Sequence, residues 1–385
     1  MRFDTSAAVT WTLTRPRPFA AMAVLSCWLA HAPLAQAQQQ VPPIPPVLKV
    51  ESLGLVQQNE HVKCRDGSYS ALVNGRAVWT FNDTCMDDGG VLGDQFIDNT
   101  LAWSKKLKAS NGINLTRDLE DVEGVPVRFV PFTQGEIDFT NSHQPNELAI
   151  WPGHIVPDPA RHRALIFFGT VYRGSQIGFQ GVGGGIAVMD DKTFAVTRPV
   201  QNPDPNAQEP TYMWNRFDQA YTGGYVLEGD MLYNYGGKGK GLATQVRVAR
   251  VPLADALDIS KWQYFDGSGW SSDPKAAKPV YDGGAAGDTV FWNDYLGMYM
   301  TVYQTFLNNT VYYRVAYRPE GPWSAQAEMF VAEQGTDPSY AARVHTEYAE
   351  KGGKVQYVTY VKNTGFLAQE LPLTKVVFGQ PAKAD

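Results

Sequence analysis

Residues 64–85 carry the clearest structural signal in the sequence and read CRDGSYSALVNGRAVWTFNDTC. Apolar and polar residues alternate on both sides of Asn74-Gly75, a dipeptide typical of the two-residue turn of a β-hairpin. Residues at equal distances from this turn face each other. The sequence therefore predicts a hairpin in which Cys64 faces Cys85 and Asp66 faces Asp83.

The facing cysteines are predicted to form a disulfide. Counted outward from the turn, Cys64 and Cys85 fall at a non-hydrogen-bonded position, where the Cα atoms lie about 4.5 Å apart. The third cysteine, Cys27, belongs to an N-terminal segment that we expect to be removed, which leaves an even pair. No four ligands show the spacing of a zinc finger, so the metal content of the chain stays open.

The facing aspartates are the first candidate for chemistry. Like charges directly opposite destabilise a hairpin, and sharing a site raises the pKa of one carboxyl group. A protonated and an ionised carboxyl together are what glycoside hydrolysis requires. The short separation favours a retaining enzyme, whose carboxyls lie about 5 Å apart. The alternative is that Asp66-Gly67 is a turn and Asp83-Thr84 caps a loop, and a β-bulge would break the pairing.

The rest of the chain indicates an all-β protein. Short aromatic and β-branched runs alternate with turn residues, and only Ala254–Ile259 looks like a helical turn. The predicted strands are Tyr69–Val73, Ala77–Phe81, Ala164–Thr170, Gly185–Met189, Gly224–Leu227, Met231–Tyr235, Thr244–Val251, Thr289–Trp292, Met298–Tyr303, Thr310–Tyr317, Val355–Val361 and Leu367–Leu371.

These strands gather into five groups, around residues 64–84, 147–198, 217–265, 285–330 and 340–378. Several groups share one pattern, a small or acidic residue followed by an apolar strand, a turn and an aromatic strand. Radial repetition of this kind predicts a five-bladed β-propeller, whose sheets leave only short, protected edges. The alternative is a two-sheet sandwich with an additional domain.

The N-terminus is typical of a secretory signal peptide. Arg15 and Arg17 precede the apolar run Phe19–Ala30, and Ala35-Gln36-Ala37 is a small-x-small cleavage motif. We therefore expect residues 1–37 to be removed and the mature protein to be secreted or periplasmic. No later stretch has the length of a membrane span.

A short Pro- and Gln-rich linker, residues 38–48, is expected to lead into a single catalytic domain over residues 49–380. The formal net charge of the chain is −6, with scattered basic residues, which argues against a nucleic-acid partner. No phosphate-binding loop, nucleophile elbow or His-Glu-x-x-His motif is present, so no cofactor is expected.

A family resemblance is carried by Arg65-Asp66-Gly67-x-Tyr69-Ser70-Ala71 and Trp79-x-Phe81-x-Asp83-Thr84. These motifs look like the opening blade of a bacterial family of uncharacterised domains that includes endo-D-arabinanases, glycoside hydrolase family 183. The resemblance covers most of residues 50–378 and implies a five-bladed propeller with two catalytic aspartates in the first blade, which match Asp66 and Asp83. Further matching segments are Ala249-Arg250-Val251-Pro252, Trp262 to Trp270, Gly321-Pro322-Trp323-Ser324, Val344-His345-Thr346-Glu347 and Val358-Thr359-Tyr360.

Polar and aromatic residues near the starts of the predicted innermost strands are expected to line a central funnel and bind substrate. Each of them alone is more often a turn, cap or structural residue. His345 and Glu347 would share one face of a strand, as a substrate contact or a calcium or water ligand pair requires, so a structural calcium ion is compatible with the sequence. The substrate-binding candidates are Glu147, Trp151, Asp218, Asp288, His345 and Glu347.

The favoured hypothesis is an exported glycoside hydrolase that cleaves arabinofuranosyl linkages of a polysaccharide with Asp66 and Asp83. Two alternatives stay open. One is a non-catalytic glycan-binding propeller, in which the carboxylates are structural or bind calcium. The other is a hydrolase of a different sugar.

Overall fold

The hairpin around Asn74-Gly75 is present in the computed structural model, which describes residues 40–382 apart from 205–206, 208, 216–217, 241–242, 285–286 and 306. The predicted register is confirmed, since Val73 faces Arg76 and Tyr69 faces Thr80. The first sheet consists of β4 (Tyr69–Val73), β5 (Arg76–Phe81) and β8 (Thr100–Ser104).

The hairpin is interrupted once, next to Asp66. Gly67 and Ser68 have φ angles of +91° and +50°, a left-handed conformation that strains residues with a side chain and suits glycine. Beyond this break the same two chain segments pair again, and Cys64 faces Cys85. The second part of the hairpin is a small sheet of β3 (Val62–Arg65), β6 (Thr84–Met86) and β7 (Phe96–Ile97).

Four larger sheets follow in chain order. The second contains β10 (Glu147–Asp158), β11 (Arg163–Gly174), β12 (Gly178–Asp190), β13 (Val196–Thr197) and β14 (Trp214–Asn215). The third contains β15 (Gly224–Glu228), β16 (Met231–Lys240), β17 (Ala243–Pro252), β18 (Gln263–Phe265), β19 (Trp270–Ser271) and β20 (Tyr281–Gly283).

The fourth sheet contains β21 (Thr289–Asn293), β22 (Met298–Gln304), β23 (Thr310–Ala316) and β24 (Ala327–Val331). The fifth contains β25 (Tyr340–Val344), β26 (Val355–Gly365), β27 (Ala368–Glu370), β28 (Pro372–Phe378) and β1 (Val47–Leu55). A separate parallel pair is formed by β2 (Gln57–Gln58) and β9 (Asn114–Leu115).

Each sheet packs against the next through a separate cluster of buried apolar side chains. One cluster joins the first and second sheets, and others join the second to the third, the third to the fourth and the fourth to the fifth. A fifth cluster, which includes Trp79 of β5 and Tyr357 of β26, joins the last sheet to the first. Buried apolar clusters thus link these sheets in chain order, and one cluster links the fifth sheet to the first.

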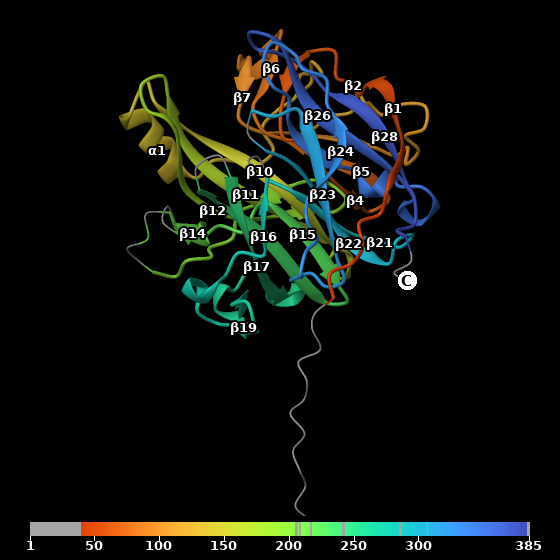
Figure 1. Ribbon diagram of the computed structural model, residues 1–385. Helices are drawn as coiled ribbons and strands as arrows, with labels where there is room; N and C mark the ends of the chain where they lie inside the picture. Colours follow the sequence, from red (N-terminus) through yellow and green to blue (C-terminus); the bar gives the residue numbers. More distant parts are fainter. Residues whose placement is uncertain are drawn as a thin grey trace, which may run out of the picture. The chain divides into compact units, whose positions relative to one another are not determined.

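The last sheet is built from both ends of the described chain. β1 pairs antiparallel with β28, and Val47 faces Phe378 (Figure 1). The carbonyl of Pro46 also accepts a hydrogen bond from the amide of Gly379 at 2.8 Å. The predicted linker over residues 38–48 therefore ends too late, because its last residues are part of the fold. The predicted signal peptide, residues 1–37, lies outside the described residues.

The prediction that only residues 254–259 are helical was wrong. An α-helix, α1 (Gln134–Ser142), lies beside β10 and begins with a capping box of Thr133 and Glu136 (Figure 1). Within the described residues, no helix is long and apolar enough to cross a membrane. Short 3-10 helices are η1 (Gly90–Leu92), η2 (Pro159–Arg161), η3 (Leu253–Asp255), η4 (Ile259–Lys261), η5 (Pro274–Ala276), η6 (Thr346–Tyr348) and η7 (Lys351–Gly353).

Candidate active site

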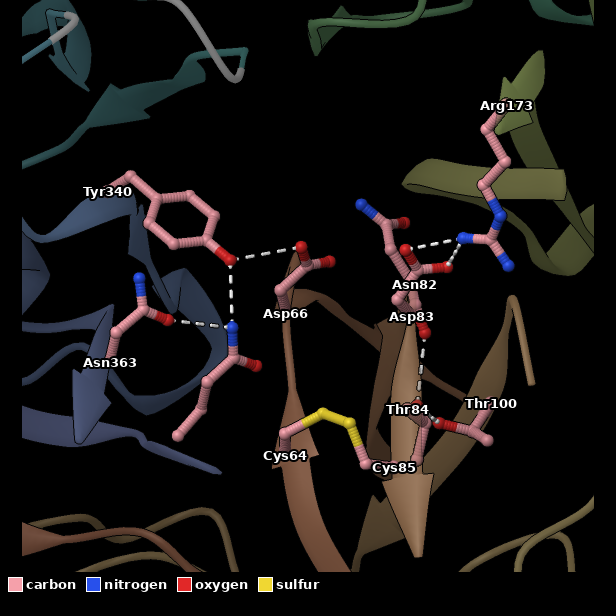
Figure 2. Close-up of a disulfide and its surroundings, with 11 residues drawn as sticks. Cys64, Asp66, Asn82, Asp83, Thr84, Cys85, Thr100, Arg173, Tyr340 and Asn363 are labelled. Carbon is pink, nitrogen blue, oxygen red and sulfur yellow. Dashed lines mark hydrogen bonds and ion pairs between the residues drawn. A yellow bond between two sulfur atoms is a disulfide. The ribbon is translucent and has the colours of Figure 1, made fainter. Parts of the chain in front are cut away.

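The predicted disulfide is present and lies next to the two aspartates. Cys64 and Cys85 are bonded, with their Cα atoms 4.8 Å apart. Asp66 and Asp83 occupy the irregular backbone between the two parts of the hairpin, and the amide of Asp66 donates to the carbonyl of Asp83 at 3.3 Å. The facing arrangement is thus retained, although the backbone turns between Asp66 and β4. Figure 2 shows Asp66 directed toward Tyr340 and Asp83 toward Arg173.

Asp66 is held by a neutral donor. The hydroxyl of Tyr340 donates to Oδ2 of Asp66 at 3.1 Å, while Oδ1 is shielded from solvent and has no hydrogen-bond partner among the described residues. Burial, followed by the negative charge of Asp83, raises the pKa of Asp66 to about 7; Tyr340, Asn82 and Arg343 act in the opposite direction. A carboxyl group with this pKa holds a proton near neutral pH and can give it away.

Tyr340 is itself fixed in place. Nε2 of Gln369 donates to the Tyr340 hydroxyl at 3.0 Å, and the same nitrogen lies 3.0 Å from Oδ1 of Asn363 (Figure 2). Both residues belong to the β26–β27 hairpin of the fifth sheet. Because its hydroxyl accepts from Gln369, the proton of Tyr340 is directed toward Asp66.

Asp83 is held by a cation. Nη1 of Arg173 lies 2.6 Å from each carboxylate oxygen, and the indole Nε1 of Trp151 donates to Oδ1 at 3.1 Å. Burial raises the pKa of Asp83, and the charge and hydrogen bonds of Arg173, followed by Trp151, oppose that rise. The two facing carboxyls therefore have different surroundings, one with neutral donors and one with a guanidinium group.

Arg173 also connects Asp83 to Glu147. Glu147 of β10 faces Arg173 of β11 in the strand register, and Nη2 of Arg173 lies 2.8 Å from Oε1 of Glu147. The guanidinium group lies over the ring of Phe96, 5.0 Å from its centroid. The structure therefore brings Glu147 and Trp151, two of the predicted substrate-binding residues, to the aspartate pair.

His345 is placed differently from the prediction. It precedes η6 rather than lying within a strand, so His345 and Glu347 do not share a strand face. The ring is buried and stacks on Trp79, and its nitrogens lie 2.6 Å from the Ser70 hydroxyl and 2.7 Å from the Thr359 hydroxyl. Burial holds the pKa of His345 well below 6.5. The buried ring is thus held by Ser70, Thr359 and Trp79, and a role of His345 in substrate binding stays a prediction.

Asp288 lines a cavity of about 290 Å³ together with Tyr225 and Arg343, and the charge of Glu347 acts on Tyr225 of the same lining. Burial raises the pKa of Glu347 to about 7, and both of its carboxylate oxygens lack a hydrogen-bond partner among the described residues. Burial raises the pKa of Asp288 to about 6, although the amide of Gly284 donates to it at 2.8 Å. Arg343 lines this cavity, and its positive charge lowers the pKa of both Asp66 and Asp288.

Asp218 lies apart from these groups. Its side chain is exposed, and Oδ2 accepts a hydrogen bond from the amide of Asn215 at 2.8 Å, as expected of a turn residue. Its nearest electrostatic effect is on Tyr264 of β18 in the third sheet. None of the described contacts brings it to Asp66 or Asp83.

Three residues of the candidate site could not be identified from the sequence patterns. They are Arg173, Tyr340 and Gln369. Arg173 is 90 residues from Asp83 and Tyr340 is 274 residues from Asp66, and no motif surrounds either. Among the described residues, no group of three or more His, Cys, Asp or Glu side chains is arranged to hold a metal ion. The arrangement can move a proton and stabilise a developing positive charge.

Several solved structures are similar to this fold. A family 117 glycoside hydrolase from the marine bacterium Zobellia galactanivorans has a TM-score of 0.53 at 11% identity, over 88% of this chain and 95% of that chain. A protein from Bacteroides ovatus has a TM-score of 0.52 at 14% identity, over 84% and 87%. The GH43_1 enzyme from Xanthomonas citri, solved with xylotriose, has a TM-score of 0.48 at 15% identity, over 84% and 89%. At these identities the first two likenesses show a shared fold.

The sequence is similar to a family of domains but not to a curated protein. No curated protein matches the chain. One family does match, over residues 54–385, which include both aspartates, the disulfide and Arg173. The chain therefore belongs to the family described as Domain of unknown function (DUF5005).

Proposed function

We propose that this chain is an exported glycoside hydrolase that uses Asp66 and Asp83 as its two catalytic carboxyl groups. One observation carries the proposal. Two facing carboxyls are kept in different states, because Asp66 has a pKa of about 7 and a shielded free oxygen, whereas Arg173 pairs with both oxygens of Asp83. Such a split between two neighbouring carboxyls is what glycosidic bond cleavage needs.

In the proposed mechanism Asp66 is the general acid. It gives its proton to the glycosidic oxygen as the bond to the anomeric carbon breaks, and the Asp83 carboxylate attacks that carbon to form a glycosyl ester. Asp66, now ionised, takes a proton from a water molecule whose oxygen attacks the same carbon and releases Asp83. The facing positions favour the short carboxyl separation of a retaining enzyme. No cofactor enters these steps.

The proposed substrate is a polysaccharide with arabinofuranosyl linkages. The support is the resemblance of the first-blade motifs to a family that includes endo-D-arabinanases, and the motifs contain both aspartates. The similar solved structures include glycoside hydrolases, one of them bound to xylotriose, which supports a carbohydrate as ligand.

We further propose a single five-bladed β-propeller that begins with β1 at Val47 and extends to residue 380, with residues 1–37 as a signal peptide. Five consecutive sheets with five intervening apolar clusters support the propeller. The disulfide between Cys64 and Cys85 supports an oxidising destination, secreted or periplasmic.

One observation favours a second candidate, a glycan-binding protein without turnover. Arg173 lies 2.6 Å from both oxygens of Asp83, so neither oxygen is free to attack while this ion pair is intact. In that case the same surface would hold a glycan that is released uncleaved.

The deciding experiment is product analysis on a polysaccharide panel that includes D-arabinan, arabinan and arabinogalactan. The mature chain is expected to release oligosaccharides, and Asp66→Asn and Asp83→Asn to lower kcat on the order of a thousandfold. Asp255→Asn, at an exposed residue of η3, is the matched control and is expected to keep full activity. Proton NMR of the first products is expected to show a retained anomeric configuration.

Each other outcome has a clear meaning. Inversion in the first product would overturn the covalent mechanism and leave Asp83 as a base. Release of oligosaccharides only from another glycan would show that the substrate is not an arabinofuranosyl polysaccharide. Binding to one polysaccharide with no release from any would establish the glycan-binding protein instead.

A further inference from the structure

A cavity of about 430 Å³ lies directly beside the Asp83–Arg173 ion pair. It is formed where β10 begins, β11 ends and β12 begins, and its lining includes Glu147, Arg173, Gly178 and Phe179. The mechanism proposed above makes no use of this space. Its lining residue Arg173 pairs with Asp83, whereas Tyr340 contacts Asp66, the other aspartate (Figure 2).

One wall of the cavity is an uncovered aromatic ring. Phe179 is 70% exposed and follows the turn at Gly178, which has a φ of +63°. Its ring centroid lies 5.6 Å from that of Trp151, whose indole donates to Asp83. Single exposed apolar residues are ordinary, but this ring lines a cavity and contacts a residue that touches the aspartate pair. A flat apolar face in that place suits the C–H face of a sugar ring.

The other wall carries an unused hydrogen-bond acceptor. Both contacts of Arg173 to Glu147 are made to Oε1, and Oε2 has no hydrogen-bond partner among the described residues. The Glu147 side chain is 47% exposed at the cavity. A carboxylate oxygen here accepts hydrogen bonds from hydroxyl groups, and such charge-assisted bonds are the stronger ones.

The charge of the cavity restricts the ligand further. When both carboxylates are ionised, Asp83 and Glu147 carry two negative charges and Arg173 supplies one positive charge. The guanidinium group is already shared between these two carboxylates, and the described lining of the cavity holds no second cation for an acidic sugar. The cavity therefore favours a neutral, hydroxylated ligand over a uronic acid.

We propose that this cavity is a subsite that binds one neutral sugar unit of a glycan chain, next to the unit that is cleaved. The ring of Phe179 is the stacking surface and Oε2 of Glu147 is the acceptor for sugar hydroxyls. The inference rests on the proposed function, since it places the cavity beside the scissile bond. It adds that the protein binds the glycan on the Asp83 side as well as at the two aspartates.

The test measures binding without turnover. Arabino-oligosaccharides from D-arabinan, from dimer to hexamer, are titrated calorimetrically into the mature chain carrying Asp66→Asn. Adding Phe179→Ala is expected to weaken binding of the hexamer about tenfold, whereas Phe179→Trp keeps the affinity. Tyr317→Ala is the matched control, since Tyr317 is a 42% exposed aromatic residue beyond β23 in the fourth sheet, and no change is expected. Oligogalacturonides of equal length are expected to bind more weakly.

The results separate this inference from the proposed function. Unchanged affinity in Phe179→Ala, or tighter binding of oligogalacturonides, overturns the subsite even if Asp66→Asn abolishes turnover. Weakened binding in Phe179→Ala, in a protein whose Asp66→Asn variant still cleaves, keeps the subsite and removes Asp66 as the acid. If no oligosaccharide of the ladder binds, both the subsite and the arabinofuranosyl substrate are wrong.

Discussion

The hydroxyl of Tyr340 donates a hydrogen bond to Oδ2 of Asp66 over 3.1 Å, joining the fifth sheet to the first at the candidate active site. A donor to a carboxylate stabilises its ionised form, so Tyr340 holds the pKa of Asp66 lower than burial alone would set it. The other groups that face Asp66 are Asp83 and Asn82 from the same hairpin and Arg343 from β25. Burial and the charge of Asp83 therefore raise the pKa of Asp66, while the hydrogen bond from Tyr340 lowers it.

This balance predicts the pH profile of the proposed glycoside hydrolase. A general acid works in its protonated form, and Asp66 loses its proton as the pH rises through about 7. The value of kcat is therefore expected to fall above pH 7, by about tenfold for each further pH unit. A profile on D-arabinan between pH 5 and 9 measures this, and a rate that stays constant to pH 9 contradicts the role of Asp66.

Tyr340→Phe removes one donor and leaves the ring in place. The pKa of Asp66 then rises. The pH at which kcat begins to fall is therefore expected to increase by about one unit. A purely structural role would lower the rate at every pH without changing the pH at which the fall begins. Tyr317→Phe, on the fourth sheet, is the control and is expected to leave the profile where it is.

Arg173→Met removes the cation from Asp83. Burial and the charge of Asp98 then act on Asp83 against the hydrogen bond from Trp151 without the larger effect of Arg173, so the pKa of Asp83 rises further and less of the ionised form is available to attack. We expect kcat to fall on the order of a hundredfold or more, with partial recovery when guanidinium ion is added at millimolar concentration.

The control for this change is Arg250→Met, in which the lost guanidinium lies over Trp270 in the third sheet. It is expected to keep the wild-type kcat. Higher activity in Arg173→Met would show instead that the ion pair blocks Asp83, as the glycan-binding candidate requires.

Loss of the disulfide is expected to lower stability. The bond between Cys64 and Cys85 closes a loop with a sequence separation of 21, and the chain-entropy model gives about 3 kcal/mol for a loop of that order. Denaturant unfolding of the Cys64→Ala, Cys85→Ala double variant measures the loss. Dithiothreitol should lower the wild-type midpoint toward that of the variant and leave the variant unchanged; equal midpoints without reductant would contradict the prediction.

Glu347→Gln is expected to change the pH dependence of stability. The pKa of Glu347 rises from 4.5 to about 7 on folding, so the stability it contributes is full below pH 4.5 and is lost as the pH rises to about 7. The neutral amide avoids this loss. The variant is therefore expected to match wild type near pH 4.5 and to exceed its free energy of unfolding by about 3 kcal/mol at pH 7.

The matched control is Glu328→Gln, at an exposed position of β24. Its difference from wild type should stay the same at both pH values. If the difference for Glu347→Gln is also the same at pH 4.5 and pH 7, burial does not raise the pKa of Glu347.

Local sequence patterns predicted the parts of the fold that depend on neighbours in the chain. The turn at Asn74-Gly75 fixed the hairpin register, and with it the disulfide and the meeting of Asp66 with Asp83, because every pairing follows from one short loop. The capping box at Thr133 and Glu136 was also visible in the sequence, and it should have indicated α1.

Contacts between distant segments could not be predicted in this way. His345 was expected to face substrate, yet Ser70 and Thr359 from two different sheets bind its nitrogens and Trp79 covers its ring. Arg173 reaches Asp83 only because the second sheet packs beside the first. The residue types can be read from the sequence. Which residues they contact depends on how the sheets pack against each other.

The pairing of β1 with β28 has a consequence for how the protein matures. Val47 finds its partner only when residue 378 is available, so the last sheet cannot form during synthesis until almost the whole chain has left the ribosome. A nascent chain therefore lacks the β1–β28 pairing of the fifth sheet up to that point. Until residues 372–378 are available, the edge of β1 that pairs with β28 has no neighbouring strand and its backbone hydrogen-bonding groups stay unpaired there.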